Sequence, residues 1–225
     1  MMNEAKGNMY SFVTHTWNTV KGKCPHKCHY CYMTKWGEQK PVRFDATELK
    51  TDLEAGNIIF VGSSCDMFAK DIPDQWILDT LAHCGKFDNT YLFQSKNPAR
   101  FHNMMEHMPP KVIFGTTIES DINHNEMGET PNVINRALAM MHLSNSGYKT
   151  MVTIEPIMSF NTEKLFASVK LCGPAWVNIG ANTNPKAKLP EPSPEKIDEL
   201  ITKLKEITEV KIKPNLKRLW NQYPK

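Results

Sequence analysis

The chain lacks a long hydrophobic run. None of its apolar stretches approaches the roughly 18 to 20 residues that a transmembrane helix requires, and the N-terminal segment has no apolar signal core. Neither a membrane span nor secretion is therefore expected, and the sequence contains no internal repeat or low-complexity tract. Its 225 residues are enough to bury one substantial core. We expect a single cytoplasmic domain over residues 1–225.

A second cluster of cysteines is also missing. Three of the six cysteines, Cys24, Cys28 and Cys31, fall within eight residues, and the other three occur singly. This distribution does not suit a disulfide framework, so reduced thiols are expected. Cys84 and Cys172 stand in apolar or helical surroundings and are interpreted as small buried hydrophobic residues.

The clustered cysteines have the spacing C-x3-C-x2-C. Three thiolates in this arrangement can bind three irons of a 4Fe-4S cluster and leave the fourth iron open to a small chelating molecule. The alternative is a structural zinc site in which His26 or His29 supplies the fourth ligand. Zinc sites usually divide their ligands between two separated pairs, and no second pair is present. The spacing therefore favours iron and sulfur over zinc.

Residues beside the cysteines carry a family resemblance. Tyr30 completes a C-x3-C-x-aromatic-C signature, by which the chain is identified as a member of the radical S-adenosylmethionine (radical SAM) superfamily. Residues 24–33, with Tyr32 directly after the last cysteine, most resemble spore photoproduct lyase. Residues 14–18 (Thr-His-Thr-Trp-Asn) resemble a phage-associated branch. The resemblance implies a 4Fe-4S cluster on the three cysteines, S-adenosylmethionine (SAM) as the second cofactor, and Tyr30 among the cofactor-binding residues.

The resemblance also implies a reaction. An electron from a flavodoxin-like or chemical donor cleaves SAM to a 5'-deoxyadenosyl radical, which abstracts a hydrogen atom from the substrate. Whether the net transformation is that of a lyase, an isomerase or another enzyme is left open.

Six segments rich in β-branched and aromatic residues alternate with amphipathic stretches, which is typical of βα units and a parallel sheet. The resemblance implies the same class, α/β, as an incomplete (β/α)6 TIM-type barrel with its active site at the carboxyl ends of the strands. A cluster loop (18–36) follows the first strand, and a helix that starts at Ser193-Pro194 leads into a basic tail (193–225). The predicted strands are Met9 to Trp17, Asn57 to Val61, Thr90 to Gln94, Val112 to Ile118, Thr150 to Ile154 and Trp176 to Ile179.

The first cofactor-binding candidates follow the second and third strands. Ser63, Ser64 and Asp66 stand where many relatives have a Gly-Gly-Glu-like motif for the amino group of SAM. The motif itself is absent, but the segment matches the Ser-x-x-Asp-x-Phe pattern of the phage-associated branch, and these side chains can accept hydrogen bonds from an ammonium. Alternatively, Ser63 and Asp66 cap the next helix. By the same resemblance Lys96 meets the cofactor carboxylate, unless it is an ordinary solvated lysine.

Later strands supply weaker candidates. Thr117 and Glu119 follow the fourth strand where relatives hold the ribose, and Glu155 follows the fifth in a similar arrangement. Either glutamate is a candidate for binding ribose or substrate. Asn178 lies in a sixth strand that resembles the G-x-I-x-G-type strand lining the adenine, although the first glycine is absent.

Two residues are candidates for returning a hydrogen atom to a product radical. In spore photoproduct lyase a tyrosine after the cluster and a cysteine near the second strand are assigned this role. Tyr32 matches the tyrosine, whereas Gly62 occupies the nearest equivalent of the cysteine and Cys65 follows a few residues later. This departure argues against the lyase reaction itself.

The substrate is inferred from charge and analogy. Lys21 to Arg43 holds six basic residues against Glu38 alone, and Lys211 to Lys225 holds five with no acid, beside Trp220 and Tyr223. Basic residues beside aromatic ones suit phosphate contacts and base stacking, although ordinary solvated surface explains them equally well. DNA or a nucleotide is the leading substrate, with base repair or phage thymidine hypermodification as the role, in the host cytoplasm if the chain is phage-encoded. The alternatives are a peptide or small-metabolite substrate, or a non-catalytic zinc or iron-sulfur module that binds nucleic acid.

Overall fold

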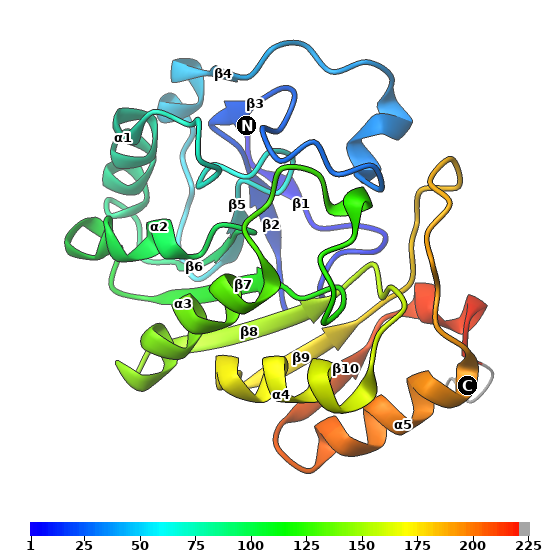
Figure 1. Ribbon diagram of the computed structural model, residues 1–225. Coiled ribbons are helices and arrows are strands. Elements are labelled where there is room, and N and C mark those ends of the chain that lie inside the picture. The colour runs from blue at the N-terminus through cyan, green and yellow to red at the C-terminus, as the bar shows by residue number, and fades with distance from the viewer. Residues whose placement is uncertain (221–225) are drawn as a thin grey trace.

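A computed structural model of the chain describes residues 1–220 and shows one large curved sheet (Figure 1). Seven of its strands run parallel, and only the first, at one edge, runs antiparallel to its neighbour. The α/β barrel-like fold expected from the alternation of strands and helices is therefore confirmed. In spatial order the strands are β1 (Asn3–Glu4), β2 (His15–Trp17), β5 (Ile58–Val61), β6 (Thr90–Gln94), β7 (Val112–Thr117), β8 (Lys149–Ile154), β9 (Trp176–Ile179) and β10 (Glu209–Ile212).

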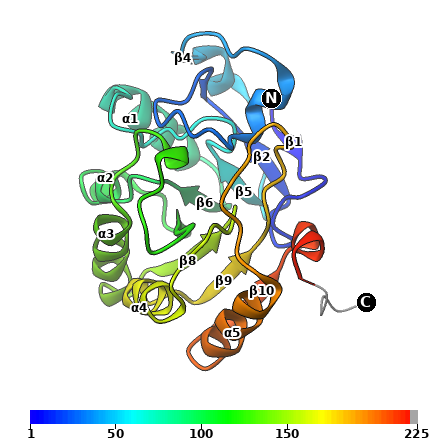
Figure 2. The ribbon, with the colours of Figure 1, turned by 45° about the vertical axis from the view of Figure 1, so that its right-hand side comes forward.

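Helices cover the outer, convex face of this sheet (Figure 2). They are α1 (Asp74–Cys84), α2 (Ala99–His102), α3 (Val133–Asn145), α4 (Thr162–Cys172) and α5 (Pro194–Lys205). The expected start of α5 is confirmed, because the Ser193 side chain accepts from the Lys196 amide and Pro194 is the first helical residue. The connection from β2 to β5 contains no α-helix. It holds the cluster loop, the 3-10 helices η1 (Tyr32–Trp36) and η2 (Ala46–Lys50), and a two-stranded sheet of β3 (Val20–Lys21) and β4 (Arg43–Phe44).

Side chains along each strand alternate between the helices and the concave interior. Phe114 of β7 packs in the large apolar cluster under the helices, whereas its neighbour Ile113 belongs to a second cluster on the other face. That second cluster also contains Leu92, Met151 and Trp176 from the neighbouring strands. The interior of the barrel is therefore a packed core in its lower part, as in other barrels of this kind.

The prediction of a first strand from Met9 to Trp17 is wrong in its first half. Only the last three residues pair as β2, and the chain turns between Tyr10 and Val13, whose amide donates to the Tyr10 carbonyl at 3.0 Å. Tyr10 and Val13 are buried in the interior cluster, with Phe12 packed against it. These apolar residues therefore pack inside the barrel and do not extend the sheet.

The seventh parallel strand, β10, lies in what the sequence suggested was a basic tail. Lys211 lies within it, with Nζ 4.9 Å from the centre of the Trp176 ring, and Lys213 directly follows it and is buried. Trp220 is also buried. These residues are therefore not free for phosphate contacts or base stacking, which corrects the prediction for this part of the tail; Tyr223 and Lys225 lie outside the described residues.

Among the residues that the structure describes, no helix is long and apolar enough to cross a bilayer.

Candidate active site

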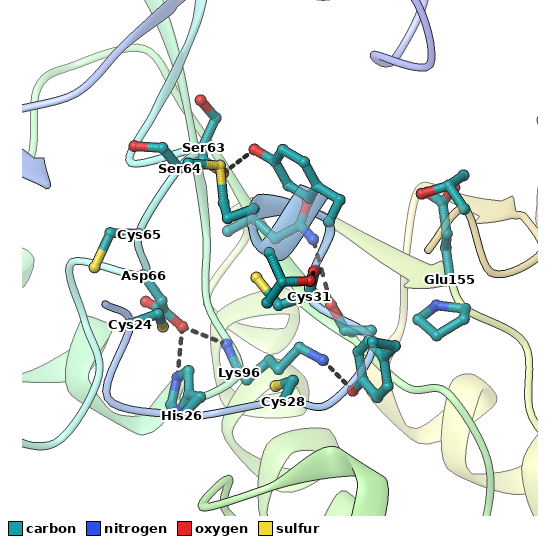
Figure 3. Close-up of a pocket in the computed structure, with 18 of the residues that line it drawn as sticks. Cys24, His26, Cys28, Cys31, Ser63, Ser64, Cys65, Asp66, Lys96 and Glu155 are labelled. Carbon is teal, nitrogen blue, oxygen red and sulfur yellow. Dashed lines mark hydrogen bonds and ion pairs between the residues drawn. The ribbon is translucent and has the colours of Figure 1, made fainter. Parts of the chain in front are cut away.

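A cavity of about 920 Å³ opens at the carboxyl ends of the parallel strands (Figure 3). The cluster loop forms one wall, and the end of β7, the segments after β5, β6, β8 and β9, and N-terminal residues 6–10 form the others. Most of the site residues expected from the sequence line it: Cys24, Cys28, Tyr30, Cys31, Tyr32, Ser63, Ser64, Cys65, Asp66, Lys96, Thr117 and Glu155. Glu119 and Asn178 are buried behind the lining. The fold thus gathers segments from most of the chain around one space.

The cluster loop is held against the loop that follows β7. The His29 amide donates to the Glu126 carbonyl at 2.9 Å, and the Glu129 amide donates to the His26 carbonyl at 2.7 Å. Gly128 makes this approach possible. Its φ is +69°, and an added Cβ would stand 2.2 Å from the His26 carbonyl oxygen. The backbone of the loop that carries the cysteines is therefore held in place at His26 and His29.

The three clustered thiols are free and partly buried, and all line the cavity. Burial raises the pKa of Cys28 and of Cys31. Cys24 differs, because a hydrogen bond with the Cys65 thiol lowers its pKa and raises that of Cys65. Within residues 1–220, no three His, Cys, Asp or Glu side chains converge on one point.

The donor set nevertheless suits an iron-sulfur cluster. Three soft sulfur ligands from a single short loop line one cavity. The two histidines of the loop line it as well, and one of them is held by other groups. His26 bonds Asp66 and the backbone, and His29 lies exposed.

Asp66 ties three loops together. One carboxylate oxygen accepts from His26 Nε2 at 2.7 Å, from the Ser95 hydroxyl at 2.9 Å and from the Lys96 amide at 2.9 Å, and the other accepts from the Phe68 amide at 2.9 Å. Burial raises its pKa, but His26 and these donors lower it overall. Asp66 therefore joins the cluster loop to the ends of β5 and β6, and α1 begins too far along the chain for it to be a cap.

Lys96 reaches back into the cavity from the end of β6. Its ammonium lies 2.5 Å from the Tyr30 hydroxyl and forms an ion pair with Glu119. Burial by itself lowers the pKa of Lys96, but the Cys28 sulfur and Glu119 raise it overall, so the lysine stays charged. It is not a solvated loop lysine, since only 16% of its side chain is exposed.

Sequence reasoning missed the second cation at this site, Arg136 of α3. Its guanidinium is fully buried and bonds Glu119 at 2.7 Å, the Thr117 carbonyl at 2.9 Å and the Thr130 hydroxyl at 2.9 Å. Burial raises the pKa of Glu119, but Arg136 and Lys96 hold it well below the usual range. One buried carboxylate therefore faces two cations, and this group carries a net positive charge.

Glu155 occupies the opposite wall. It accepts from Lys213 at 2.6 Å, from Asn215 at 2.6 Å and from Asn8 at 2.8 Å. Gly180 of the next strand end makes room for it, because an added Cβ would lie 2.7 Å from Glu155 Oε1. Three segments far apart in the sequence thus meet on this carboxylate.

The interior becomes polar toward the cavity. Gln94 and Thr117 are joined by a 3.3 Å hydrogen bond, and Gln94 also accepts from the Tyr10 hydroxyl at 2.8 Å. Thr153 lies beside them with a buried hydroxyl that has no partner among the described residues. Asn178 follows at the same level and donates to the Met151 sulfur at 3.6 Å. These groups form a polar floor.

The remaining candidates form the lip on the β5 side. Asn18 bonds the Ser63 hydroxyl at 3.3 Å and accepts from the Ser64 amide at 2.9 Å. The Tyr32 hydroxyl donates to the Ser63 carbonyl at 2.7 Å, and 43% of the tyrosine is exposed. Cys65 lies deeper, beside Cys24. Tyr32 is therefore bonded to the segment that follows β5, and Cys65 belongs to that segment.

Neither the family models nor the curated proteins contain a match to this sequence. Solved structures do match its fold. A spore photoproduct lyase variant with bound AdoMet and dinucleoside spore photoproduct superimposes with a TM-score of 0.64 at 13% identity, over 92% of this chain and 78% of that one. The lyase complexed with dinucleoside spore photoproduct gives the same values. The chain has an α/β fold similar to that of spore photoproduct lyase.

Proposed function

We propose that this protein is a radical SAM enzyme. Cys24, Cys28 and Cys31 would bind three irons of a 4Fe-4S cluster and leave the fourth for SAM. The observation that carries the proposal is the position of these thiols, which face Lys96 across one cavity at the carboxyl ends of a parallel sheet. The structural similarity to spore photoproduct lyase supports the same reading. When bound, the cluster supplies one electron that cleaves SAM to a 5'-deoxyadenosyl radical, which abstracts a hydrogen atom from the substrate.

Charge around Lys96 favours a carboxylate ligand. Glu119 carries one negative charge and is paired with two cations, Arg136 and Lys96, so one positive charge is left over. Of the two cations, Lys96 is the one that lines the cavity. The methionyl carboxylate of SAM is the ligand we assign to it. Glu119 and Tyr30 then act by holding the ammonium in place.

Hydrogen-bonding groups elsewhere on the wall suit the rest of SAM. The Ser63 and Ser64 hydroxyls lie on the lip next to the cysteines and are assigned to the methionyl amino group. The polar floor of Thr117 and Thr153, with Glu155, is assigned to the ribose or the substrate.

We further propose a nucleic-acid base or nucleotide as the substrate, which the enzyme modifies or repairs. One of the matching lyase structures carries AdoMet and dinucleoside spore photoproduct, and this chain has a similar fold. Tyr32 is assigned to hydrogen-atom return, with Cys65, a lining thiol outside the cluster loop, as the second candidate. Thymidine in phage DNA is one substrate of this class.

The test is anaerobic reconstitution with iron and sulfide, followed by addition of SAM and dithionite. The proposal predicts a brown protein with about four irons and formation of 5'-deoxyadenosine. Cys28→Ala should lose both, whereas Cys84→Ala, which removes a buried thiol outside the cavity, should lose neither. Lys96→Met should keep the cluster and weaken SAM binding.

Metal analysis separates the proposed radical SAM enzyme from its alternative, a zinc-binding module. A colourless protein that binds zinc and forms no 5'-deoxyadenosine would contradict the proposal. An iron-loaded protein whose Cys28→Ala variant is equally active would contradict it as well.

A further inference from the structure

Within residues 1–220, the most exposed aromatic side chain stands at the lip of the cavity. Trp36 is the last residue of η1, the 3-10 helix that directly follows Cys31, and 77% of it is exposed. It lines the cavity together with Lys35. A tryptophan is the largest apolar surface a side chain can offer, and this one covers no core.

Hydrogen bonds hold η1, the short helix that carries Trp36, on two sides. The Asn184 amide, from the long loop between β9 and α5, donates to the Thr34 hydroxyl at 2.9 Å and to the Cys31 carbonyl at 3.3 Å. On the other side the Tyr32 hydroxyl bonds the Ser63 carbonyl at 2.7 Å. The indole is therefore presented from a fixed backbone, as a recognition residue needs to be.

A second hollow continues from the cavity past η1. The two share Lys35, Asn182 and Thr183, and the second also has Lys188 and Arg218 in its lining. Arg218 is paired with Glu191. Lys35 and Lys188 are exposed and form no ion pair with any residue from 1 to 220. The path away from the cavity is therefore lined by two free cations.

Charge at the cavity mouth has the same sign. Lys23 is exposed and unpaired within the described chain, whereas the two acidic residues of the lining, Asp66 and Glu155, are already bonded to internal partners. Free positive charge next to an exposed aromatic ring is the combination that binds single-stranded nucleic acid, in which phosphates need cations and bases need a stacking surface.

We propose that Trp36 stacks on a base of a single-stranded segment of nucleic acid, and that Lys35 and Lys188 contact its phosphates while the neighbouring nucleotide enters the cavity. A duplex would have to extrude that nucleotide to reach the same place. The inference rests on the proposed function for the identity of the site, but it concerns binding and not cleavage of SAM.

The experiment measures binding of a fluorescein-labelled 12-nucleotide single strand to the reconstituted protein by anisotropy, across a series of salt concentrations. Trp36→Ala should weaken binding by about 5-fold to 100-fold, and Trp36→Phe should restore most of it. Lys35→Gln should weaken binding and reduce the slope of log K against log salt by about 0.7, the value for one phosphate on a single strand. Controls are Ile134→Ala, an exposed apolar residue of α3, and Lys86→Gln, an exposed lysine beyond α1; both should bind as wild type does.

Iron content and 5'-deoxyadenosine formation are measured for every variant, so that the two proposals fail separately. Equal binding by Trp36→Ala and wild type, or binding that does not depend on salt, would overturn the inference. So would failure of the wild type to bind any strand while it still cleaves SAM. Salt-dependent, Trp36-dependent binding by a protein that forms no 5'-deoxyadenosine would leave the inference standing and remove the proposed function.

Discussion

Glu119 and Glu155 follow neighbouring strands, and each meets a lysine, yet their surroundings differ. Glu119 has no exposed surface and is held by Arg136 and Lys96, whereas Glu155 keeps 16% of its side chain exposed and is held by Lys213 and two asparagines. The first carboxylate faces two charges inside the protein, and the second faces one charge at the cavity. Although the two glutamates follow their strands in similar positions, Glu119 supports the cavity wall from behind and Glu155 is accessible on the wall itself.

Removing the buried charge should give the largest effect. Glu119→Gln leaves Lys96 and Arg136 buried without a counter-ion, so we expect a loss of about 3 to 5 kcal/mol in the free energy of unfolding. Urea denaturation of the purified variant measures this. Glu155→Gln is the matched control and should lose less than half as much, because Glu155 is itself partly exposed and faces one cation instead of two. Equal losses would show that the two sites do not differ in the way described.

Acid should act on Glu119 with a defined sign. Its pKa in the folded protein lies below its unfolded value of about 4.3. The stability it contributes is therefore fully present above that value and is lost as the pH falls toward the lowered pKa. Urea midpoints measured between roughly pH 5 and pH 3 should fall more steeply for wild type than for Glu119→Gln. Parallel profiles would rule out this assignment.

The space that Gly180 leaves for Glu155 can be filled directly. In Gly180→Ala the new methyl group would meet the side-chain oxygens of Glu155 and Asn215, at 2.7 and 2.8 Å. Both side chains must move, at a cost of about 1 to 3 kcal/mol. A thermal melt measures the loss. SAM binding should weaken in parallel. Gly85→Ala is the control, because its backbone is in the right-handed helical region and the new atom would meet only ordinary contacts at 3.6 Å and beyond.

The smallest effect is the coupling between Glu155 and Lys213. A double-mutant cycle with Glu155→Gln and Lys213→Met should give about 1 kcal/mol, since the pair is partly solvated. The corresponding cycle for Glu119 and Arg136, which are fully buried, should give a clearly larger value. If the order of the two coupling energies were reversed, the comparison would fail.

Much of the architecture follows from local sequence. The strands at 90–94 and 176–179 occur with the predicted bounds, because each is a short, continuous β-rich run that is buried on both faces. β10 was missed since Glu209 and Lys211 make a four-residue strand look like charged surface. The segment from Tyr10 to Val13 misled in the opposite direction, because side chains that fill a barrel have the same composition as a strand.

The site was predictable where a motif marked it and not elsewhere. The cysteines and Lys96 stand in recognisable positions, and the structure brings them to one cavity. Arg136 had a signal that could have been used: it lies on the buried stripe of α3 with Val133, Ala137 and Met140, where a charge must have a buried partner. Lys213 had none, because its partner is determined by the return of the chain across the sheet.

The meeting of Asn8, Glu155, Lys213 and Asn215 fixes an order of events during biosynthesis. Cys24, Cys28 and Cys31 leave the ribosome before the wall on the far side of the cavity can form, because that wall needs residue 215. Until then the thiols are more open to oxidation than in the folded protein. We therefore expect the proposed cluster to be loaded best after residue 215 has joined the fold, and coexpression with an assembly system that acts on folded proteins should improve recovery of the holoprotein.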